Sequence, residues 1–188
     1  MAKTAIIIGA TGLTGGLLLQ GLLEDNRYQK IKLFSRNTCN IRHPKIEEHL
    51  IDLFELEKQQ HLFIADEVFC CIGTTKAKTP NEEQYLKIDY AIPAALARLC
   101  RKMGIPTFLV ISALGANKKS KIFYNRTKGR MEEEILRNTI KNTYILQPSL
   151  IGGSRNEKRL GEKIAKLFMS VLNPFLIGSL KKYRSIHP

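Results

Sequence analysis

A glycine-rich segment near the N-terminus, Gly9-Ala10-Thr11-Gly12-Leu13-Thr14-Gly15, limits what this chain can fold into more than any other feature. It follows a β-branched run (residues 4–8) and precedes leucines at helical spacing (residues 13–24), so it joins a buried strand to a helix. Glycines at such a junction allow a tight turn and close approach of a pyrophosphate, and the helix N-terminus adds free N–H groups. The segment therefore predicts a phosphate-binding turn, with a tight turn that holds no ligand as the alternative. The residues expected to bind are Gly9, Thr11, Gly12, Leu13, Thr14 and Gly15.

Apolar runs and helical patterns alternate along the rest of the chain. The apolar runs are continuous, which is typical of parallel strands that helices cover on both faces. The further strands are predicted at 31–35, 49–52, 67–73, 107–112 and 142–146. The further helices are predicted at 80–104, with a kink at Pro93, at 121–138 and at 158–172. We therefore predict an α/β fold with a doubly wound parallel β-sheet, the Rossmann fold, as one domain over residues 1–188 with a short C-terminal extension.

The residues after the second strand predict which dinucleotide binds. A site for NAD usually has Asp or Glu about 20 residues after the glycines, where it accepts hydrogen bonds from the ribose hydroxyls. At that distance from Gly15 this chain has Ser35-Arg36-Asn37, without a carboxylate. The Arg36 guanidinium would pair with a 2′-phosphate and stack on adenine. NADP(H) is therefore the preferred cofactor and NAD(H) the second candidate, and a solvated Arg36 is the alternative interpretation.

Two tyrosines have a lysine four residues later in the sequence. Tyr28 and Lys32 span a loop and the start of a strand, so their side chains need not share a face. Tyr124 and Lys128 lie at positions i and i+4 of a predicted helix, which puts both on one face. Ser112 precedes them at the C-terminal end of a strand, the edge where open α/β sheets place their sites. We expect the second pair, and not the first, to belong to a site.

Taken together, these features resemble the short-chain dehydrogenase/reductases, in their extended or atypical branch. The resemblance covers residues 4 to about 153, and segment 70–76 is most similar to the Tat-interacting-protein-like oxidoreductases. It implies an NADP-dependent oxidoreductase that reduces a carbonyl or oxidises an alcohol. The alternative is a dinucleotide-sensing regulatory protein with little or no turnover that acts through protein partners. The motifs that carry the resemblance are Gly9–Gly15, Asp52, Cys71-Ile72-Gly73-Thr74, Ser112, Tyr124-Asn125-Arg126-Thr127-Lys128 and Pro148-Ser149.

The resemblance also implies a role for each site residue. Tyr124 would exchange a proton with the substrate oxygen, because a nearby lysine cation favours the phenolate and lowers the tyrosine pKa from its usual value near 10. Ser112 would hydrogen-bond the same oxygen, and Lys128 would also hold the nicotinamide ribose. Asp52 and Pro148 have second interpretations, as a cap of the next turn and as part of an ordinary loop. The cofactor contacts expected beyond the glycine segment are Arg36, Asp52, Gly73, Thr74, Lys128 and Pro148.

Two positions depart from the family pattern. In much of the family an asparagine on the fourth helix completes a proton relay, and Asp89 occupies that approximate place here. Its carboxylate could still accept hydrogen bonds, but with a different charge. Residues 71–74 replace an asparagine-rich signature. The family contacts its substrate after the sixth strand, so residues 151–188 would form a small substrate-side extension.

The charge of the chain bears on its partners. The net charge of +13 is uneven, since residues 1–117 have 14 Lys and Arg against 12 Asp and Glu, and residues 118–188 have 16 against 5. A basic surface can bind nucleic acid, but no motif for that accompanies the charge, so a solvated surface is expected instead. Residues 118–121 are likewise a solvated loop or a rim that attracts an anionic substrate. We expect a small-molecule substrate, with a homodimer and a protein partner as open alternatives.

Cysteines and terminal sequences bear on location. Cys39, Cys70, Cys71 and Cys100 show no disulfide framework, which indicates reduced thiols. The four histidines lack ligand spacing, so no metal site is predicted. The chain shows neither a run of about 18 apolar residues nor a charged leader with a cleavage site. These observations predict a cytoplasmic protein without a membrane span.

Overall fold

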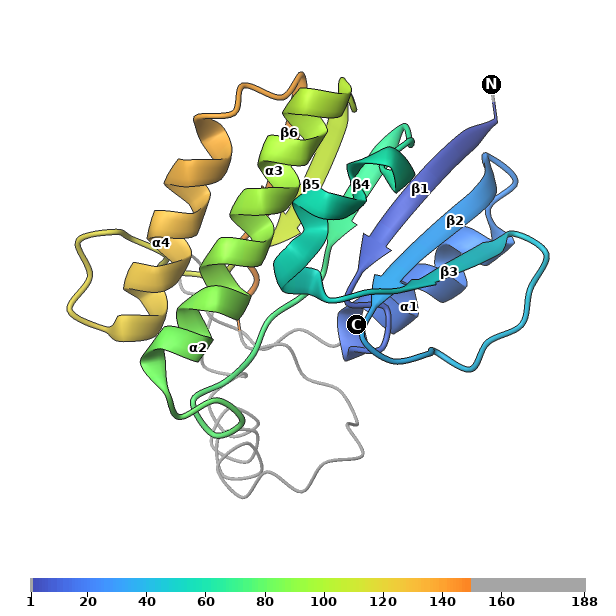
Figure 1. The fold of residues 1–188 in the computed structure, drawn as a ribbon. Helices are drawn as coiled ribbons and strands as arrows, with labels where there is room; N and C mark the ends of the chain where they lie inside the picture. Colours follow the sequence, from blue (N-terminus) through green and yellow to red (C-terminus); the bar gives the residue numbers. More distant parts are fainter. Residues whose placement is uncertain (1, 150–188) are drawn as a thin grey trace, which may run out of the picture.

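The computed structural model describes residues 2–149, which form one six-stranded sheet (Figure 1). Neighbouring strands are parallel, in the order β3-β2-β1-β4-β5-β6. The order changes direction between β1 and β4, and open α/β sheets bind ligands at the carboxyl ends of the strands beside such a switch point. The predicted fold class, a doubly wound parallel sheet, is confirmed. The strands are β1 (Lys3–Ile8), β2 (Tyr28–Ser35), β3 (Ile46–Leu50), β4 (Glu67–Cys70), β5 (Thr107–Ile111) and β6 (Asn142–Leu146).

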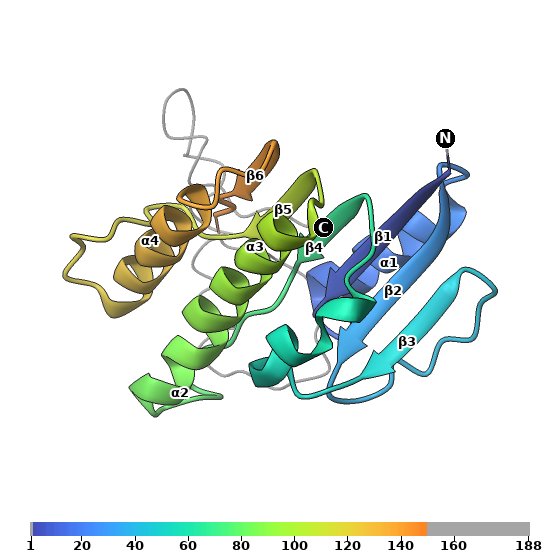
Figure 2. The same ribbon diagram turned by 45° about the horizontal axis from the view of Figure 1, so that its top comes forward.

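Helices lie on both faces of this sheet, as Figures 1 and 2 show. One face is covered by α1, which packs on β1 and β2, and the other by η1, α3 and α4. The helices of the described part are too short or too polar to cross a bilayer. The helical elements are α1 (Leu13–Glu24), the 3₁₀ segment η1 (Leu53–Leu62), α2 (Glu82–Leu86), the π-helical turn η2 (Lys87–Ala91), α3 (Ile92–Met103) and α4 (Phe123–Leu136).

The central strands are buried on both faces. Ile6, Ile8 and Phe34 belong to the apolar cluster under η1 and α3, whereas Ile7 belongs to the cluster under α1. A strand with two buried faces needs apolar residues at successive positions, which explains the continuous runs in the sequence. The same packing fixes the strand ends, because Ile8 pairs with Phe34 on one side and with Cys70 on the other. The loops that carry the predicted site residues therefore start from one level of the sheet.

The largest differences from the predicted strand boundaries lie in β2, β3 and β4. β2 begins at Tyr28 rather than at 31, and β4 ends at Cys70 rather than at 73. The third strand, predicted at 49–52, is present but lies earlier in the sequence, since β3 is Ile46–Leu50. Its two glutamates are poor strand formers, and pairing with β2 outweighs that preference. Asp52 thereby falls outside the strand and is free to cap the helical segment that follows.

The helix predicted after Pro80 is present, and its disturbance at Pro93 is a π-helical turn. Proline has no N–H, so the helical ladder loses a donor at this position. Directly before it, the Ile92 N–H donates to the Lys87 carbonyl five residues back. Such turns insert an extra residue into a helix and often occur at functional sites. Asp89 lies within this turn and is only 1% exposed, so the predicted kink serves to place a carboxylate in the interior.

All four cysteines are free thiols, and Cys70 and Cys100 are buried. The predicted helix 158–172 and the predicted extension 151–188 lie outside the described residues.

Candidate functional site

Two of the three glycines in the N-terminal turn are required by close backbone contacts. Gly9 has φ of +91°, and a Cβ there would lie 2.9 Å from the carbonyl carbon of Cys71. A Cβ on Gly15 would lie 2.2 Å from the Gly9 carbonyl oxygen. A side chain at either position would displace backbone, because the end of β1, the start of α1 and the end of β4 meet here. Gly12 differs, because it is exposed and its N–H donates to the Gly9 carbonyl at 3.0 Å.

The first turn of α1 presents backbone N–H groups that have no partner in the described part of the chain. The first N–H groups of a helix cannot bond within it, and α1 has neither a side-chain cap nor an acidic residue in its first turn. Within residues 2–149, the N–H groups of Leu13, Thr14 and Gly15 make no hydrogen bond, and Thr11 beside them is exposed. Unpaired donors at the positive end of a helix suit an anion. This turn therefore fits the pyrophosphate of a dinucleotide.

Arg36 lies at the same sheet edge as the glycine turn. Ile8, the last residue of β1, pairs with Phe34, and Arg36 directly follows the end of β2, so both chains leave the sheet at the same edge. Its side chain is exposed and, within the described residues, makes no hydrogen bond or ion pair. The guanidinium is therefore available to an anionic group of a ligand in the turn.

Four other predicted cofactor contacts follow β3, β4 and β6. The Asp52 carboxylate accepts a hydrogen bond from the Phe54 N–H at 2.9 Å and caps η1. Its interpretation as a cap is thus confirmed, and its contact with adenine stays a prediction. Gly73 is exposed, whereas the Thr74 hydroxyl is bonded to that of a neighbouring threonine at 2.8 Å. The Pro148 carbonyl accepts a backbone hydrogen bond at 2.9 Å from the loop after β5. The structure places all four at the carboxyl edge of the sheet.

A buried ion pair joins η2 to α4. Lys128 Nζ lies 2.9 Å from Asp89 Oδ1, and the two side chains are 5% and 1% exposed. The second Asp89 oxygen accepts the Thr74 N–H at 2.7 Å, and Lys128 Nζ also donates to the Ile111 carbonyl at 3.4 Å. A buried ion pair needs such additional hydrogen bonds to offset its desolvation. Lys128 is therefore fixed between the ends of β4 and β5.

Tyr124 lies in the first turn of α4, one turn before Lys128. It is 41% exposed, and its hydroxyl makes no hydrogen bond within the described part of the chain. Burial of the rest of the ring raises its pKa; Lys128 lowers it and Asp89 raises it again, and the net direction is upward. Lys128 thus acts on the Tyr124 pKa in the expected direction, but the expected net lowering is not found, because burial of the ring outweighs the lysine charge and Asp89 opposes it as well.

The Ser112 hydroxyl donates to the Glu132 carboxylate. Gln147 donates to the same carboxylate, with Nε2 at 2.8 and 3.0 Å from its two oxygens. Glu132 was not among the predicted site residues. It could have been found by extending the helical spacing, since Tyr124, Lys128 and Glu132 follow one another at intervals of four and so share one face of α4. The predicted contact of Ser112 with a substrate oxygen stays a prediction.

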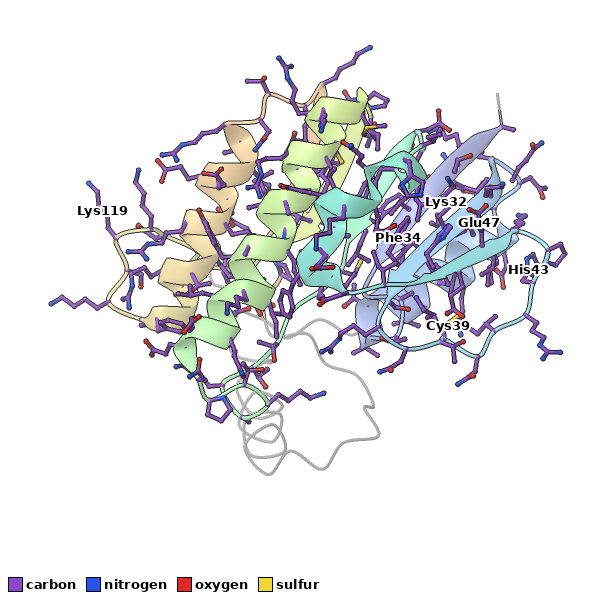
Figure 3. All side chains as sticks on the ribbon, viewed as in Figure 1. Lys32, Phe34, Cys39, His43, Glu47 and Lys119 are labelled. Carbon is purple, nitrogen blue, oxygen red and sulfur yellow. The ribbon has the colours of Figure 1, made fainter. Side chains whose placement is uncertain are left out.

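The lysines before α4 lie on the outside of the molecule. Lys118 Nζ is 2.5 Å from a Glu133 carboxylate oxygen, and Figure 3 shows Lys119 projecting outward from the loop. This arrangement favours the solvated loop over a rim for a substrate.

The comparisons with known proteins agree with this geometry. A model of the family described as NAD(P)H-binding matches residues 9–166. The chain belongs to this NAD(P)H-binding family. The match includes the glycine turn, the buried ion pair and Tyr124, and the resemblance to atypical short-chain dehydrogenase/reductases is confirmed.

Curated relatives and solved structures give the same result. A protein named FMP52, mitochondrial, of Debaryomyces hansenii is 31% identical over 159 residues, covering 83% of this chain and 70% of that protein. The HTATIP2 protein of Rattus norvegicus is 28% identical over 174 residues, covering 90% and 72%. Among solved structures, UDP-glucose 4-epimerase of Thermotoga maritima has a TM-score of 0.70 at 14% identity, covering 91% of this chain and 63% of that one. At such identity the likeness shows the fold alone.

The predicted cytoplasmic location is wrong. Relatives from Debaryomyces hansenii, Scheffersomyces stipitis and Aspergillus fumigatus are named mitochondrial, which points away from a purely cytoplasmic protein. Free thiols argue against the secretory route only, so they could not distinguish between the compartments that keep thiols reduced.

Proposed function

We propose that this chain is an NADP-dependent oxidoreductase that reduces a carbonyl or oxidises an alcohol by hydride transfer. The observation that carries the proposal is the position of Tyr124 and Lys128, one helical turn apart at the sheet edge that also holds the glycine turn. Unpaired N–H groups at the start of α1 support pyrophosphate binding at that edge. Residues 151–188 would form the substrate side.

When bound, the nicotinamide supplies or accepts the hydride. Tyr124 would give its phenolic proton to the substrate oxygen during reduction, or take the alcohol proton during oxidation. Tyr124 is partly exposed and its hydroxyl makes no hydrogen bond to residues 2–149, which suits it to this task. Lys128 is buried and held by Asp89, so its ammonium group would serve as a fixed donor to the nicotinamide ribose. The pyrophosphate would lie on the first turn of α1.

Ser112 can take its proposed role only if its hydrogen bond to Glu132 is first broken or reversed. Its single O–H donates to Glu132, so toward a ligand the hydroxyl can only accept. A carbonyl oxygen also only accepts, and Ser112 can therefore polarise it only after its proton leaves Glu132. This exchange would occur on substrate binding, or when Glu132 is protonated and donates instead.

The preference for NADP rests on Arg36, an exposed cation at the edge of the glycine turn that has no ion-pair partner among residues 2–149. Calorimetric titration with NADPH and with NADH tests it, with Arg36→Ala alongside. NADPH affinity should fall about tenfold or more in this variant with NADH affinity nearly unchanged, because only NADPH carries the 2′-phosphate. Arg101→Ala is the control, since Arg101 is an exposed arginine in the last turn of α3, at the opposite edge of the sheet. Equal losses for both cofactors would remove the phosphate contact from the proposal.

Turnover is tested by following NADPH oxidation over a panel of aldehydes and ketones. Consumption that depends on the carbonyl and is lost in Tyr124→Phe supports the oxidoreductase. Tight NADPH binding without turnover on the panel favours the second candidate, a dinucleotide-sensing protein. The observation in favour of that candidate is the engagement of Ser112 by Glu132, which leaves Tyr124 without a second hydroxyl donor. Its protein partners, and a homodimer, stay predictions.

A further inference from the structure

Asp89 is the most enclosed ionisable side chain at the predicted site. One oxygen faces Lys128 Nζ at 2.9 Å and the other accepts the Thr74 N–H at 2.7 Å. These contacts join three segments, because Asp89 belongs to η2, Lys128 to α4 and Thr74 to the loop after β4. Figure 1 shows α4 lying beside the helix that contains η2. Both acceptor oxygens of Asp89 are therefore engaged within one small region.

The charge of this carboxylate changes the environment of Tyr124. A buried lysine alone next to a tyrosine stabilises the phenolate, and an opposite charge at close range typically shifts a pKa by about 1–3 units. Here the cation is matched by an anion, so the buried pair is neutral overall. An asparagine at the same position could accept one hydrogen bond from Lys128 but could not cancel its charge.

We propose that Asp89 is a positioning residue that fixes Lys128 and the Thr74 amide and cancels the lysine charge, so that Tyr124 stays a neutral phenol. A neutral phenol is the proton donor that carbonyl reduction needs, whereas alcohol oxidation needs the phenolate as acceptor. Asp89 therefore keeps Tyr124 up to alkaline pH in the protonation state that carbonyl reduction uses. The inference rests on the proposed roles of Tyr124 and Lys128.

The other titratable groups near the Asp89–Lys128 pair are uncharged near neutral pH and add no charge beside Tyr124. Tyr85 of α2 is buried, and burial and Asp89 raise its pKa, so it stays neutral. Cys70 at the end of β4 is fully buried, and burial raises the pKa of its thiol to about 12. Lys128 and Asp89 are then the two charged groups that the described elements direct toward Tyr124. Removing the charge of Asp89 should be felt directly at the Tyr124 hydroxyl.

The test is a tyrosinate titration of the cofactor-free protein by absorbance in the near ultraviolet. Each variant is paired with the same variant carrying Tyr124→Phe, so that the difference isolates Tyr124 from the other five tyrosines. In the natural protein Tyr124 should remain protonated up to at least pH 10. Asp89→Asn should lower its pKa by about one unit or more. Asp89→Glu keeps the charge and should hold the pKa within about half a unit of the natural value.

Adding Lys128→Met to Asp89→Asn should return the Tyr124 pKa toward its natural value, because both charges are then gone. In the loaded protein, the alkaline limb of the pH–rate profile for carbonyl reduction should move down with Asp89→Asn by the same amount. An unchanged or higher Tyr124 pKa in Asp89→Asn overturns the inference. Titration of Tyr124 below pH 9 in the natural protein overturns it as well, and needs no variant to fold. Because neither titration involves a cofactor, failure of NADPH to bind would count against the proposed function and not against this charge cancellation.

Discussion

The chain contains the pattern Tyr-x-x-x-Lys twice, once in β2 (the strand copy) and once in α4 (the helix copy). The two copies differ in geometry and in how their polar groups are bonded. Four residues along a strand advance about 13 Å, but four residues along a helix advance about 6 Å and return to the same face. Tyr28 accordingly begins β2, whereas Lys32 lies in the middle of that strand. The Tyr28 hydroxyl donates to Glu67 at 2.5 Å, and Lys32 Nζ donates to the Leu62 carbonyl at 3.0 Å.

The two copies differ in whether their polar groups are already bonded within the protein. In the strand copy both polar groups are used by the protein, and both residues are buried. In the helix copy Lys128 is used by Asp89, but the Tyr124 hydroxyl is exposed and has no partner within the described residues. Figure 3 shows Lys32 on the sheet near Glu47, its neighbour on β3, far from α4. Of the two copies, the one in α4 is therefore the one that leaves a polar group available to a ligand within the described residues.

The largest difference is expected for loss of the two tyrosine hydroxyls. Tyr124→Phe should lower kcat for carbonyl reduction by about 10²–10⁴-fold, because it removes the proposed acid, while NADPH affinity changes little. Tyr28→Phe removes a similar hydroxyl from the other copy and should leave kcat unchanged. Steady-state kinetics of both variants with one carbonyl substrate makes the comparison. Equal effects of the two substitutions would mean that the helix copy is not the site.

Removing the lysine of each copy should lower the free energy of unfolding by different amounts. Lys128→Met leaves Asp89 buried without its counter-ion and should lower the free energy of unfolding by about 3–5 kcal/mol. Lys32→Met removes one charged hydrogen bond to a carbonyl and should cost about 1.5 kcal/mol. Urea unfolding followed by circular dichroism measures both. Adding Asp89→Asn to Lys128→Met should restore part of the loss, and a Lys128→Met variant as stable as Lys32→Met would contradict the buried pair.

The sequence was sufficient to predict the fold and the sheet edge that holds the site. The glycine turn between Ile8 and Leu13 could be predicted from sequence because it depends on neighbouring residues only. It needs a strand, a turn that excludes side chains and the start of a helix. The spacing of Tyr124 and Lys128 was readable for the same reason, once the helix was assigned.

The contacts between charged and polar side chains at the candidate site could not be predicted from sequence. Asp89 reaches Lys128 across 39 positions because a π-turn rotates it inward, and Ser112 finds Glu132 across 20. Helical spacing could have suggested Glu132, but no local pattern shows which strand-end hydroxyl it meets. The strand at Ile46–Leu50 was misplaced for a related reason, since pairing with β2 decides it and its own glutamates argue against it.

The smallest expected difference is in the alkaline limit of stability. Burial, and then the hydrogen bond to Glu67, raises the pKa of Tyr28 above its usual value near 10. The unfolded chain thus loses this proton near pH 10 while the folded chain keeps it. The stability that the neutral phenol contributes is complete below pH 10 and is lost as pH rises toward the folded pKa, at up to about 1.4 kcal/mol per pH unit.

Tyr28→Phe should therefore flatten the fall in stability between pH 9.5 and 11, measured as urea midpoints in steps of half a unit. Tyr124→Phe should flatten it less, since the Tyr124 ring is 41% exposed and ionises closer to the unfolded value. Other lysines and tyrosines titrate in the same range, but they are common to both variants, so the difference between the two slopes reports the two phenols. A slope that Tyr28→Phe leaves unchanged would show that the buried phenol of the strand copy is not held neutral by the fold. The difference between the strand copy and the helix copy would then rest on the properties of Tyr124 alone.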